Sequence, residues 1–327
     1  TLDLKKPEAI DVITKLLKSC DIVLENFRPG TMTRLNFDYS IARQIKPDII
    51  WCSITGFGQT GPLANRQAYD QIIQGLCGVM SLTGTKETSP MRVGYQVCDT
   101  LSAITGAFAI AAALYRRKVS GEGEFIDLSM LDASIASMPS WPMSNYLNAG
   151  LKPTPMGNDN GASAPSGTFK TKEGMLNIVA NDQKQFEALC DAIDAPHIKE
   201  NPNFIDRPTR VRHRDELRDQ IEERLKTRTA REWDKILARY NVPAGLILSL
   251  PEILEHEHVA ARGIIKSFDE EAIGIPFQVH KLGFNLAQHP ADVTLPPPRL
   301  GEQTEELLLS LGYSQQSIAD LKGKKVI

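Results

Sequence analysis

Two aspartates in the first half of the chain lie where a carboxylate could do chemistry. Asp99 directly precedes a long apolar helix predicted over 100–115. Aspartate is a preferred N-cap residue, and position alone favours that structural role. A helix N-terminus also stabilises a carboxylate as an anion, which suits a carboxylate nucleophile. Asp132 is a second cap candidate, with fewer functional groups around it.

Polar side chains also gather at three expected strand ends, and ligands of open α/β sheets bind beyond the carboxyl ends of the strands. The three segments are 25–30, 56–61 and 92–99. The first contains an amide, an aromatic ring and a guanidinium, with Arg34 one turn later, which suits a ligand with phosphates and a flat ring. A turn with a surface arginine is the simpler interpretation, and the residues alone leave it open.

The segment 56–61, GFGQTG, follows the apolar run 48–53 and matches the G-x-G-x-x-G of dinucleotide-binding sites. In those sites the third glycine lies in a helix whose N-terminus faces a pyrophosphate, and an acid ends the next strand about twenty residues on. Here Pro62 follows the third glycine, no helix is expected before about Tyr69, and no acid stands at the required position. We interpret the segment as a glycine-rich strand-end loop.

The composition is that of an ordinary globular protein, at 42% hydrophobic and 24% charged residues. A chain of 327 residues is too long for one compact core, so two domains are expected. The net charge of −3 argues against a nucleic-acid partner. The longest apolar run, around 107–114, is short of membrane-spanning length, so we predict a buried helix and no membrane partner.

Cysteine and histidine usage limits the chemistry. The five cysteines are scattered, odd in number and form no C-x-x-C, which predicts reduced thiols and no zinc site. All six histidines lie after position 196, so the first 196 residues cannot supply a catalytic histidine. His256 and His258 lack the spacing of a helical metal pair and are interpreted as part of a solvated helix face. No metal is expected.

Strands and helices alternate in the first half, which predicts an α/β domain with a parallel sheet. Helices are expected at 7–19, 31–46, 69–80, 99–118 and from 131, and strands at 22–24, 48–54 and 124–130. Residues 1–4 resemble the interior of a strand, and the chain does not begin with Met. We therefore expect the natural N-terminus to lie upstream, so targeting signals cannot be judged. A cytoplasmic location is expected.

The second half has a different character. Proline and glycine accumulate over 139–167, which predicts a loop or linker. A hairpin is expected from 168–170 and 176–180, then charged helices at 183–193 and 213–239, a proline-rich return at 285–300 and a helical tail at 302–323. We predict a large domain over 1–150, a smaller α+β domain over 151–284, and a return to the large domain over 285–327.

Several long strings together resemble family III of the CoA-transferases, the CaiB/BaiF family. They run collinearly from TLDLKKPEA through DIVLENFRPGTMTRL, PDIIWCSITGFGQTGP and AYDQIIQGLCGVMSLTG to PPPRLGEQTEELLLSLGY. The resemblance implies a Rossmann-like large domain made from both chain ends, a small inserted α+β domain, and an interlocked homodimer. It also implies that the opening βα segment of the family, which helps to shape its CoA site, precedes Thr1.

The resemblance assigns roles residue by residue. The family's nucleophile, an aspartate in a VG-x-x-x-x-D string, falls on Asp99. Further catalytic positions fall on Tyr69 and Asp70, near the thioester, and on Gly157 and Gly161, which end a loop that covers the intermediate. Positions that contact CoA fall on Leu2, Lys5, Asn26, Phe27, Arg28 and Arg34. The implied reaction moves CoA from an acyl-CoA to a carboxylic acid through an aspartyl anhydride and an aspartyl-CoA thioester, with CoA as substrate and no tightly bound cofactor.

Three other functions compete with this interpretation. A 2-methylacyl-CoA racemase shares the fold, but its histidine falls on Tyr69, so half of its acid–base pair is missing. An NAD(P)-dependent oxidoreductase is disfavoured at Pro62. A CoA-binding protein without turnover stays open. The sequence does not identify the acyl group or the acceptor, although Arg66 or Arg92 could pair with a second carboxylate.

Overall fold

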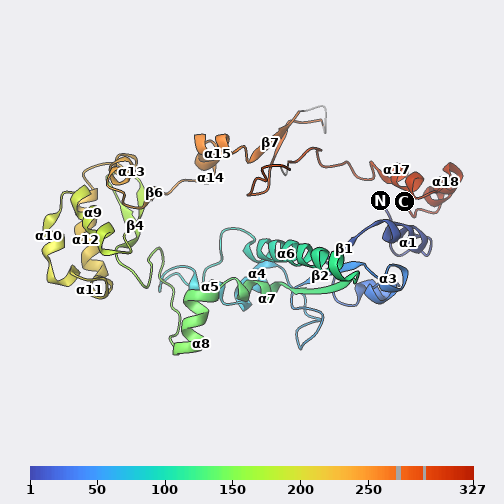
Figure 1. Cartoon of the computed structure of the whole chain (residues 1–327), viewed down its shortest axis with the longest axis horizontal. Helices are drawn as coiled ribbons and strands as arrows, with labels where there is room; N and C mark the ends of the chain where they lie inside the picture. The colour runs from blue at the N-terminus through green and yellow to red at the C-terminus, as the bar shows by residue number, and fades with distance from the viewer. Residues whose placement is uncertain (270–273, 290–291) are drawn as a thin grey trace. The chain divides into compact units, whose positions relative to one another are not determined.

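The computed structural model describes residues 1–269, 274–289 and 292–327. The chain forms two compact units (Figure 1). Unit 1 comprises Thr1–Pro155 and Pro297–Ile327, and unit 2 comprises Met156–Pro296. The sequence had suggested divisions after residues 150 and 284, and Pro290 and Ala291 of the expected proline-rich return lie outside the described residues.

Unit 1 contains a parallel sheet with the strand order β1-β2-β3, which confirms the predicted α/β class. The strands are β1 (Ile22–Glu25), β2 (Ile50–Thr55) and β3 (Glu124–Ser129). The central strand β2 is an apolar run whose residues Ile50, Trp51 and Cys52 are all buried, as expected for a parallel strand covered on both faces. Because the strands are parallel, their carboxyl ends lie at one edge of the sheet.

Helices cover this sheet, and two of the predicted ones are broken. Unit 1 contains α1 (Ala9–Ser19), α2 (Thr31–Arg34), α3 (Tyr39–Ile45), α4 (Asp70–Leu76), α5 (Val79–Leu82), α6 (Val97–Ser120) and α7 (Met130–Ala136). The helix expected over 31–46 is interrupted where Asn36 has φ 55° and Asp38 caps α3. The helix expected over 69–80 is interrupted at Gly78, whose φ of 93° suits glycine.

The two ends of the chain pack together in unit 1. Helices α17 (Thr304–Ser310) and α18 (Gln315–Gly323) share a buried apolar cluster with α1, formed by Ala9, Val12, Leu308, Ile318, Leu321 and Val326. The strand expected at residues 1–4 is wrong: this segment is irregular, and the Asp3 N–H donates to the carbonyl of Val326. Residues 139–149, expected as linker, form a π-helix over Pro139–Ser144 and α8 (Asn145–Ala149).

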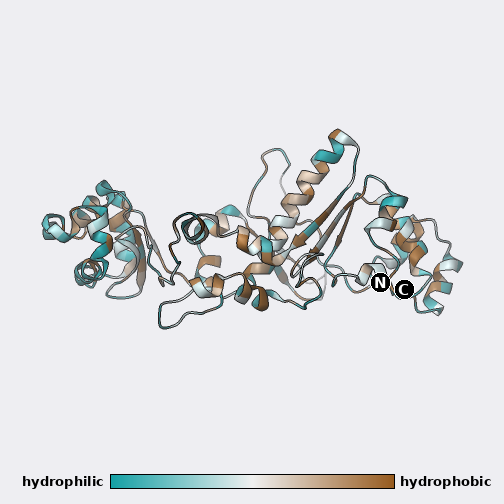
Figure 2. Cartoon of the chain, turned by 90° about the horizontal axis from the view of Figure 1, so that it is seen from below, coloured by the Kyte–Doolittle hydropathy of each residue, from teal (hydrophilic) through white to brown (hydrophobic). Residues whose placement is uncertain are grey.

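Helix α6 is 24 residues long, and its two sides differ. On the sheet side, a Cβ at Gly106 would lie 3.3 Å from Leu128 and 3.5 Å from Ile54, so glycine permits the close approach. The other side carries exposed apolar residues, with Phe108 75% exposed, and the apolar colouring of the helix is visible in Figure 2. The sequence-based expectation of a buried helix is therefore wrong.

Within the described residues, α6 is also the one helix that is long and apolar enough to cross a membrane by length and composition. A single such helix is weak support for a membrane span, because core helices of soluble proteins pass the same test. The expectation that the protein has no membrane partner stays a prediction.

Unit 2 has its own sheet and core. Strands β4 (Ser166–Lys170), β5 (Met175–Val179) and β6 (Ala244–Leu246) pair antiparallel, which confirms the predicted hairpin. Helices α9 (Gln183–Ala192), α10 (Pro196–Glu200), α11 (Arg207–Arg212), α12 (Arg214–Leu225) and α13 (Ala230–Arg239) surround a buried apolar core. The unit also contains a 3₁₀ turn (Pro202–Phe204), α14 (Leu250–Leu254), α15 (Glu257–Arg262), and the hairpin of β7 (Ile265–Phe268) and β8 (Phe277–His280).

Candidate active site

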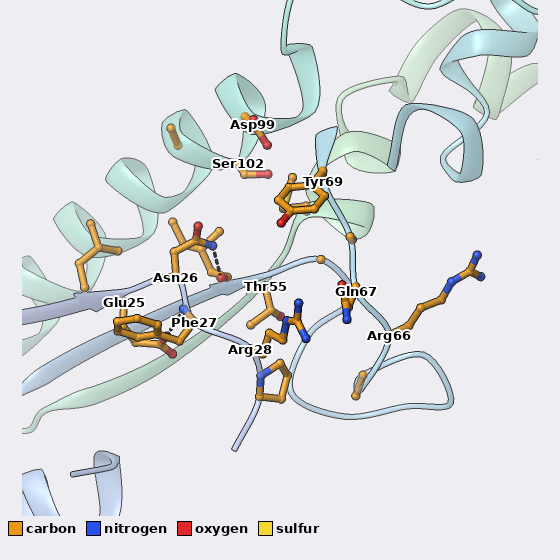
Figure 3. A pocket seen from close by; sticks show the side chains of 18 residues that line it. Glu25, Asn26, Phe27, Arg28, Thr55, Arg66, Gln67, Tyr69, Asp99 and Ser102 are labelled. Carbon is orange, nitrogen blue, oxygen red and sulfur yellow. Dashed lines mark hydrogen bonds between the residues drawn. The ribbon is translucent and has the colours of Figure 1, made fainter. Parts of the chain in front are cut away.

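A cavity of about 730 Å³ lies at the carboxyl ends of β1 and β2 in unit 1. Its wall comes from the turn after β1, the end of β2, the segment before α4 and the first turns of α6 (Figure 3). Charged and polar side chains in the lining include Glu25, Asn26, Arg28, Thr55, Arg66, Gln67, Tyr69, Asp99 and Ser102. This edge of the sheet is where ligands bind in open α/β folds.

Asp99 lies in this cavity wall, in the first turn of α6. Position in the sequence alone favoured Asp99 as the N-cap, and the structure corrects this, because α6 begins at Val97 with Gln96 as its N-cap. Asp132, the other cap candidate, is not an N-cap either, because it lies in the first turn of α7, whose N-cap is Ser129. The helix dipole still favours an anion at these first-turn positions.

The side-chain hydrogen bonds that cap the start of α6 come from a residue of another helix and not from its N-cap residue. Asp70, the first residue of α4, is 7% exposed. Its Oδ1 accepts hydrogen bonds from the backbone N–H groups of Cys98 at 2.8 Å and Asp99 at 3.4 Å. These donors belong to the otherwise unpaired N–H groups of a helix start. Asp70 therefore holds the first turn of α6, and with it the nucleophile candidate.

Gln74, one turn along α4, completes this arrangement. Its Nε2 donates to Asp70 Oδ2 at 2.6 Å, and its Oε1 accepts from the backbone N–H of Val93 at 2.9 Å. Gln74 is fully buried, so the segment that leads into α6 is fixed from inside the fold. Gln74 was not among the residues predicted from the sequence, although its spacing of four residues from Asp70 on one helix was a usable signal.

The surroundings of Asp99 change its acidity. Partial burial raises the pKa of the Asp99 carboxyl, and the nearby Asp70 carboxylate raises it further. The Asp99 carboxylate accepts no hydrogen bond from the described residues and is exposed to solvent. It is therefore a more basic carboxylate than an ordinary aspartate, and its oxygens are free to react.

Three residues of the turn after β1 share the cavity with Asp99. Asn26 donates from Nδ2 to the carbonyl of Ile54 at 2.5 Å, which ties the turn to the end of β2. Phe27 is 45% exposed, and Arg28 has no ion-pair partner among the described residues. Tyr69 is 75% exposed and lies on the side of the cavity toward Asp99 and Ser102 (Figure 3).

Other predicted CoA contacts lie outside this lining. Arg34 donates from Nη2 to Thr31 Oγ1 at 2.8 Å within α2. Leu2 packs against the apolar cluster of α1, α17 and α18, and Lys5 is exposed in the turn before α1. Of the two arginines considered for a second carboxylate, Arg66 belongs to the cavity lining, and Arg92 donates to the carbonyl of Val93.

The predicted covering loop, 157–161, belongs to unit 2. Asp159 in this loop pairs with Arg218 of α12. Arg214 donates to the carbonyl of Asn160 at 3.1 Å and to that of Gly161 at 3.4 Å, while Gly157 has φ 61°. The loop is thus a defined turn held by two arginines of its own unit.

The glycine loop 56–61 lacks the geometry of a dinucleotide site. No helix starts in it, and the next helix in the chain is α4 at Asp70. The backbone N–H of Gln59 donates to both carboxylate oxygens of Asp127, each at 3.0 Å. A pyrophosphate at this loop would face the Asp127 carboxylate, and like charges repel.

A cavity at the strand ends of a parallel α/β sheet, lined by the Asp99 carboxylate and by the Arg28 guanidinium, which has no ion-pair partner among the described residues, has the position of a ligand site and suits an anionic ligand. The model of CoA-transferase family III matches residues 1–304, and the chain belongs to this family. It is accordingly a CoA-transferase. Within the described residues no cluster of metal-ligating side chains is present.

Named relatives and solved structures agree with this assignment. The succinate–glutarate CoA-transferase of Agrobacterium fabrum is 34% identical over 94% of this chain and 77% of its own length. The formyl-CoA:oxalate CoA-transferase of Bradyrhizobium diazoefficiens is 32% identical over 98% of this chain and 80% of its own length. A CaiB/BaiF family protein from Brucella suis superimposes with a TM-score of 0.83 at 30% identity, covering 95% of this chain and 80% of its own.

Proposed function

We propose that the protein transfers CoA from an acyl-CoA thioester to a free carboxylic acid, with Asp99 as the nucleophile. An Asp99 oxygen attacks the thioester carbonyl, the C–S bond breaks, and a mixed anhydride and CoA thiolate form. The thiolate attacks the aspartyl carbonyl of the anhydride, which releases the donor acid and leaves an aspartyl-CoA thioester. The acceptor carboxylate then attacks this thioester, and the returning thiolate converts the second anhydride to product and free Asp99.

The observation that carries this proposal is the Asp99 carboxylate, which accepts no hydrogen bond from the part of the chain that the structure describes, in the same cavity as the turn of Asn26, Phe27 and Arg28. A guanidinium without a protein partner suits a phosphate group, and a carboxylate of raised pKa is a better nucleophile than an ordinary one. The donor and the product are both CoA thioesters of similar energy, so the exchange needs no external energy source, and positioning and backbone N–H donors supply most of the acceleration.

The direct test is a panel of acyl-CoA donors against carboxylic acids, with the products identified by mass spectrometry. Succinate, glutarate and oxalate are the first acceptors to include, because the names of the similar proteins contain these dicarboxylic acids. Transfer of CoA to at least one acid, with release of the donor acid, supports the proposal. Hydrolysis without transfer to any acid would contradict it.

The alternatives are separable from transfer. A racemase of this fold needs an acid–base partner opposite Asp99, and the described lining of the cavity offers Tyr69 there and no histidine. Retention of the α-proton of a 2-methylacyl-CoA in deuterated water would exclude racemisation. An oxidoreductase needs a dinucleotide at the glycine loop, where the backbone N–H of Gln59 already donates to the Asp127 carboxylate. Saturable binding of NADH, competed by NAD, would revive that alternative.

We also propose that the protein works as a homodimer. The exposed side of α6 carries Ile104, Phe108, Tyr115 and Val119, between 63% and 75% exposed, and exposed apolar faces of this kind mark association surfaces. Light scattering should then give twice the chain mass. Phe108→Glu should shift the protein toward the monomer, whereas a monomeric wild type would contradict the proposal.

A further inference from the structure

Glu25 is a buried carboxylate in the cavity wall, directly before the turn 26–28. It is the last residue of β1 and is 8% exposed. Its Oε2 accepts the backbone N–H of Phe27 at 2.7 Å, and its Oε1 accepts the hydroxyl of Ser53. Ser53 lies opposite Glu25 in the pairing of β1 with β2, so the hydrogen bond between these two side chains links the two strands.

The bonding continues into the core. Ser53 is 3% exposed and its Oγ accepts the indole N–H of Trp51 at 3.1 Å, while Trp51 itself is 1% exposed. A buried carboxylate is costly unless hydrogen bonds satisfy it, and hydrogen bonds to an ionised group are stronger than neutral ones. The chain of Trp51, Ser53 and Glu25 therefore fixes the direction of the Phe27 amide, and with it the start of the turn.

Both oxygens of Glu25 are thus occupied by neutral donors, and this affects Arg28. Arg28 is three residues away and would be a natural ion-pair partner for Glu25, yet the structure records no ion pair between them. The Arg28 guanidinium lies in the cavity lining without a partner among the described residues. A guanidinium in this state can form a bidentate bond with a phosphate.

We propose that Glu25 is a positioning residue for CoA, which holds the turn 26–28 in the cavity wall and leaves Arg28 free for an anionic group of the ligand. The role rests on the proposed function, since it names a CoA thioester as the ligand of this cavity. Glu25 acts through Phe27 and Arg28 and does not take part in the acyl chemistry at Asp99. Substitution of Glu25 should therefore change the affinity for CoA and leave the rates of the chemical steps unchanged.

The test compares Glu25→Gln with wild type in the full chain, using calorimetric titration with CoA and steady-state kinetics. Glutamine keeps the shape but loses the charge and one acceptor, so the Kd for CoA and the KM for acyl-CoA should rise about tenfold. The kcat at saturating substrate should stay within about twofold, because positioning by Glu25 contributes to binding. Ser53→Ala, which leaves the carboxylate free to pair with Arg28, should weaken CoA binding in the same direction.

Asp127→Asn is the matched control, because Asp127 also accepts a backbone N–H at a strand-end loop but lies outside the cavity lining. It should leave the Kd for CoA unchanged. The positioning role is overturned by unchanged affinity in Glu25→Gln and Ser53→Ala, by equal weakening in Asp127→Asn, or by a fall in kcat alone. If Glu25→Gln does not fold, Ser53→Ala decides. If the wild type binds CoA but transfers it to no acid, the proposed function fails and the positioning role of Glu25 is not affected.

Discussion

Asp70 and Asp99 lie in the first turns of two helices that meet in unit 1, and their surroundings are opposite. Asp70 is 7% exposed, and its oxygens accept from two backbone N–H groups and from Gln74. Asp99 is exposed at the cavity, and its carboxylate accepts no hydrogen bond from the described residues. One carboxylate is satisfied inside the fold, and the other is left available to a ligand.

The difference separates structure from chemistry within one site. A buried carboxylate with three donors stabilises the contacts around it and has little capacity left for a substrate. A carboxylate that accepts no hydrogen bond from the described residues adds no such bond to the fold, and the burial and the neighbouring charge that raise the pKa of Asp99 work against its ionised form. Such groups are typical of functional sites, where stability is given up for reactivity.

The substitution Asp99→Asn tests this difference between Asp70 and Asp99 most directly. An amide cannot form the anhydride, so transferase activity should fall on the order of 10³-fold or more, while CoA binding persists. Asp99 is exposed, so the variant should fold. Activity is measured by product formation from acyl-CoA and acid, with intact-mass confirmation that asparagine is retained.

Asp132→Asn provides the matched control, because Asp132 occupies the same first-turn position in α7 and lies outside the cavity lining. It should keep wild-type activity. Wild type quenched with acyl-CoA and treated with hydroxylamine should carry a mass change on the peptide that contains Asp99. Full activity in Asp99→Asn would end the nucleophile hypothesis.

The sequence predicted the position of Asp99 in the site but not its structural context. Its distance from Val93 and Gly94 and the apolar helix after it were visible in the residues, and the resemblance supplied the role. The cap of α6 was not predictable in this way. Asp70 lies 28 residues before Cys98 and reaches it through the packing of α4 on α6, and no local pattern encodes such a contact.

The fold shows the same limit. Alternating apolar segments predicted the parallel sheet and most helices, since strand and helix periodicities are local properties. The breaks at Asn36 and Gly78 depend on single residues with positive φ, which a helical pattern averages over. The exposed side of α6 was missed because an apolar run predicts burial without saying which element, if any, covers it.

A second way to test the comparison is Asp70→Ala. Removing this carboxylate leaves the buried N–H of Cys98 without its acceptor, which should cost about 1–3 kcal/mol of stability. Turnover should fall as well, because the first turn of α6 positions Asp99. Denaturant unfolding measures the stability, and Asp132→Ala, an exposed aspartate in α7, should stay within about 0.5 kcal/mol of wild type. Equal stability of Asp70→Ala and wild type would contradict the capping role.

A third prediction concerns pH. The nucleophile acts when ionised, and the pKa of Asp99 is raised by burial and then by Asp70. The activity of the wild type should therefore decline on acidification at a higher pH than an ordinary aspartate would give. Asp70→Asn removes the second cause and keeps an acceptor for Cys98, so the acid limb of the kcat/KM profile should move to lower pH. A limb that stays in place or moves to higher pH would show that Asp70 does not influence Asp99.

The smallest expected effect is on stability, and it has the opposite sign to the effect on activity. A carboxyl whose pKa is higher in the folded than in the unfolded chain binds its proton more tightly when folded, so folding is disfavoured wherever the group is ionised. This penalty is fully present above the raised pKa of folded Asp99 and is lost as the pH falls below the ordinary value for aspartate. Asp99→Asn should thus have a slightly higher Tm than wild type at neutral pH, and the difference should shrink on acidification. A Tm of Asp99→Asn below that of wild type at neutral pH would mean that the Asp99 carboxylate stabilises the fold, and the contrast with Asp70 would fail.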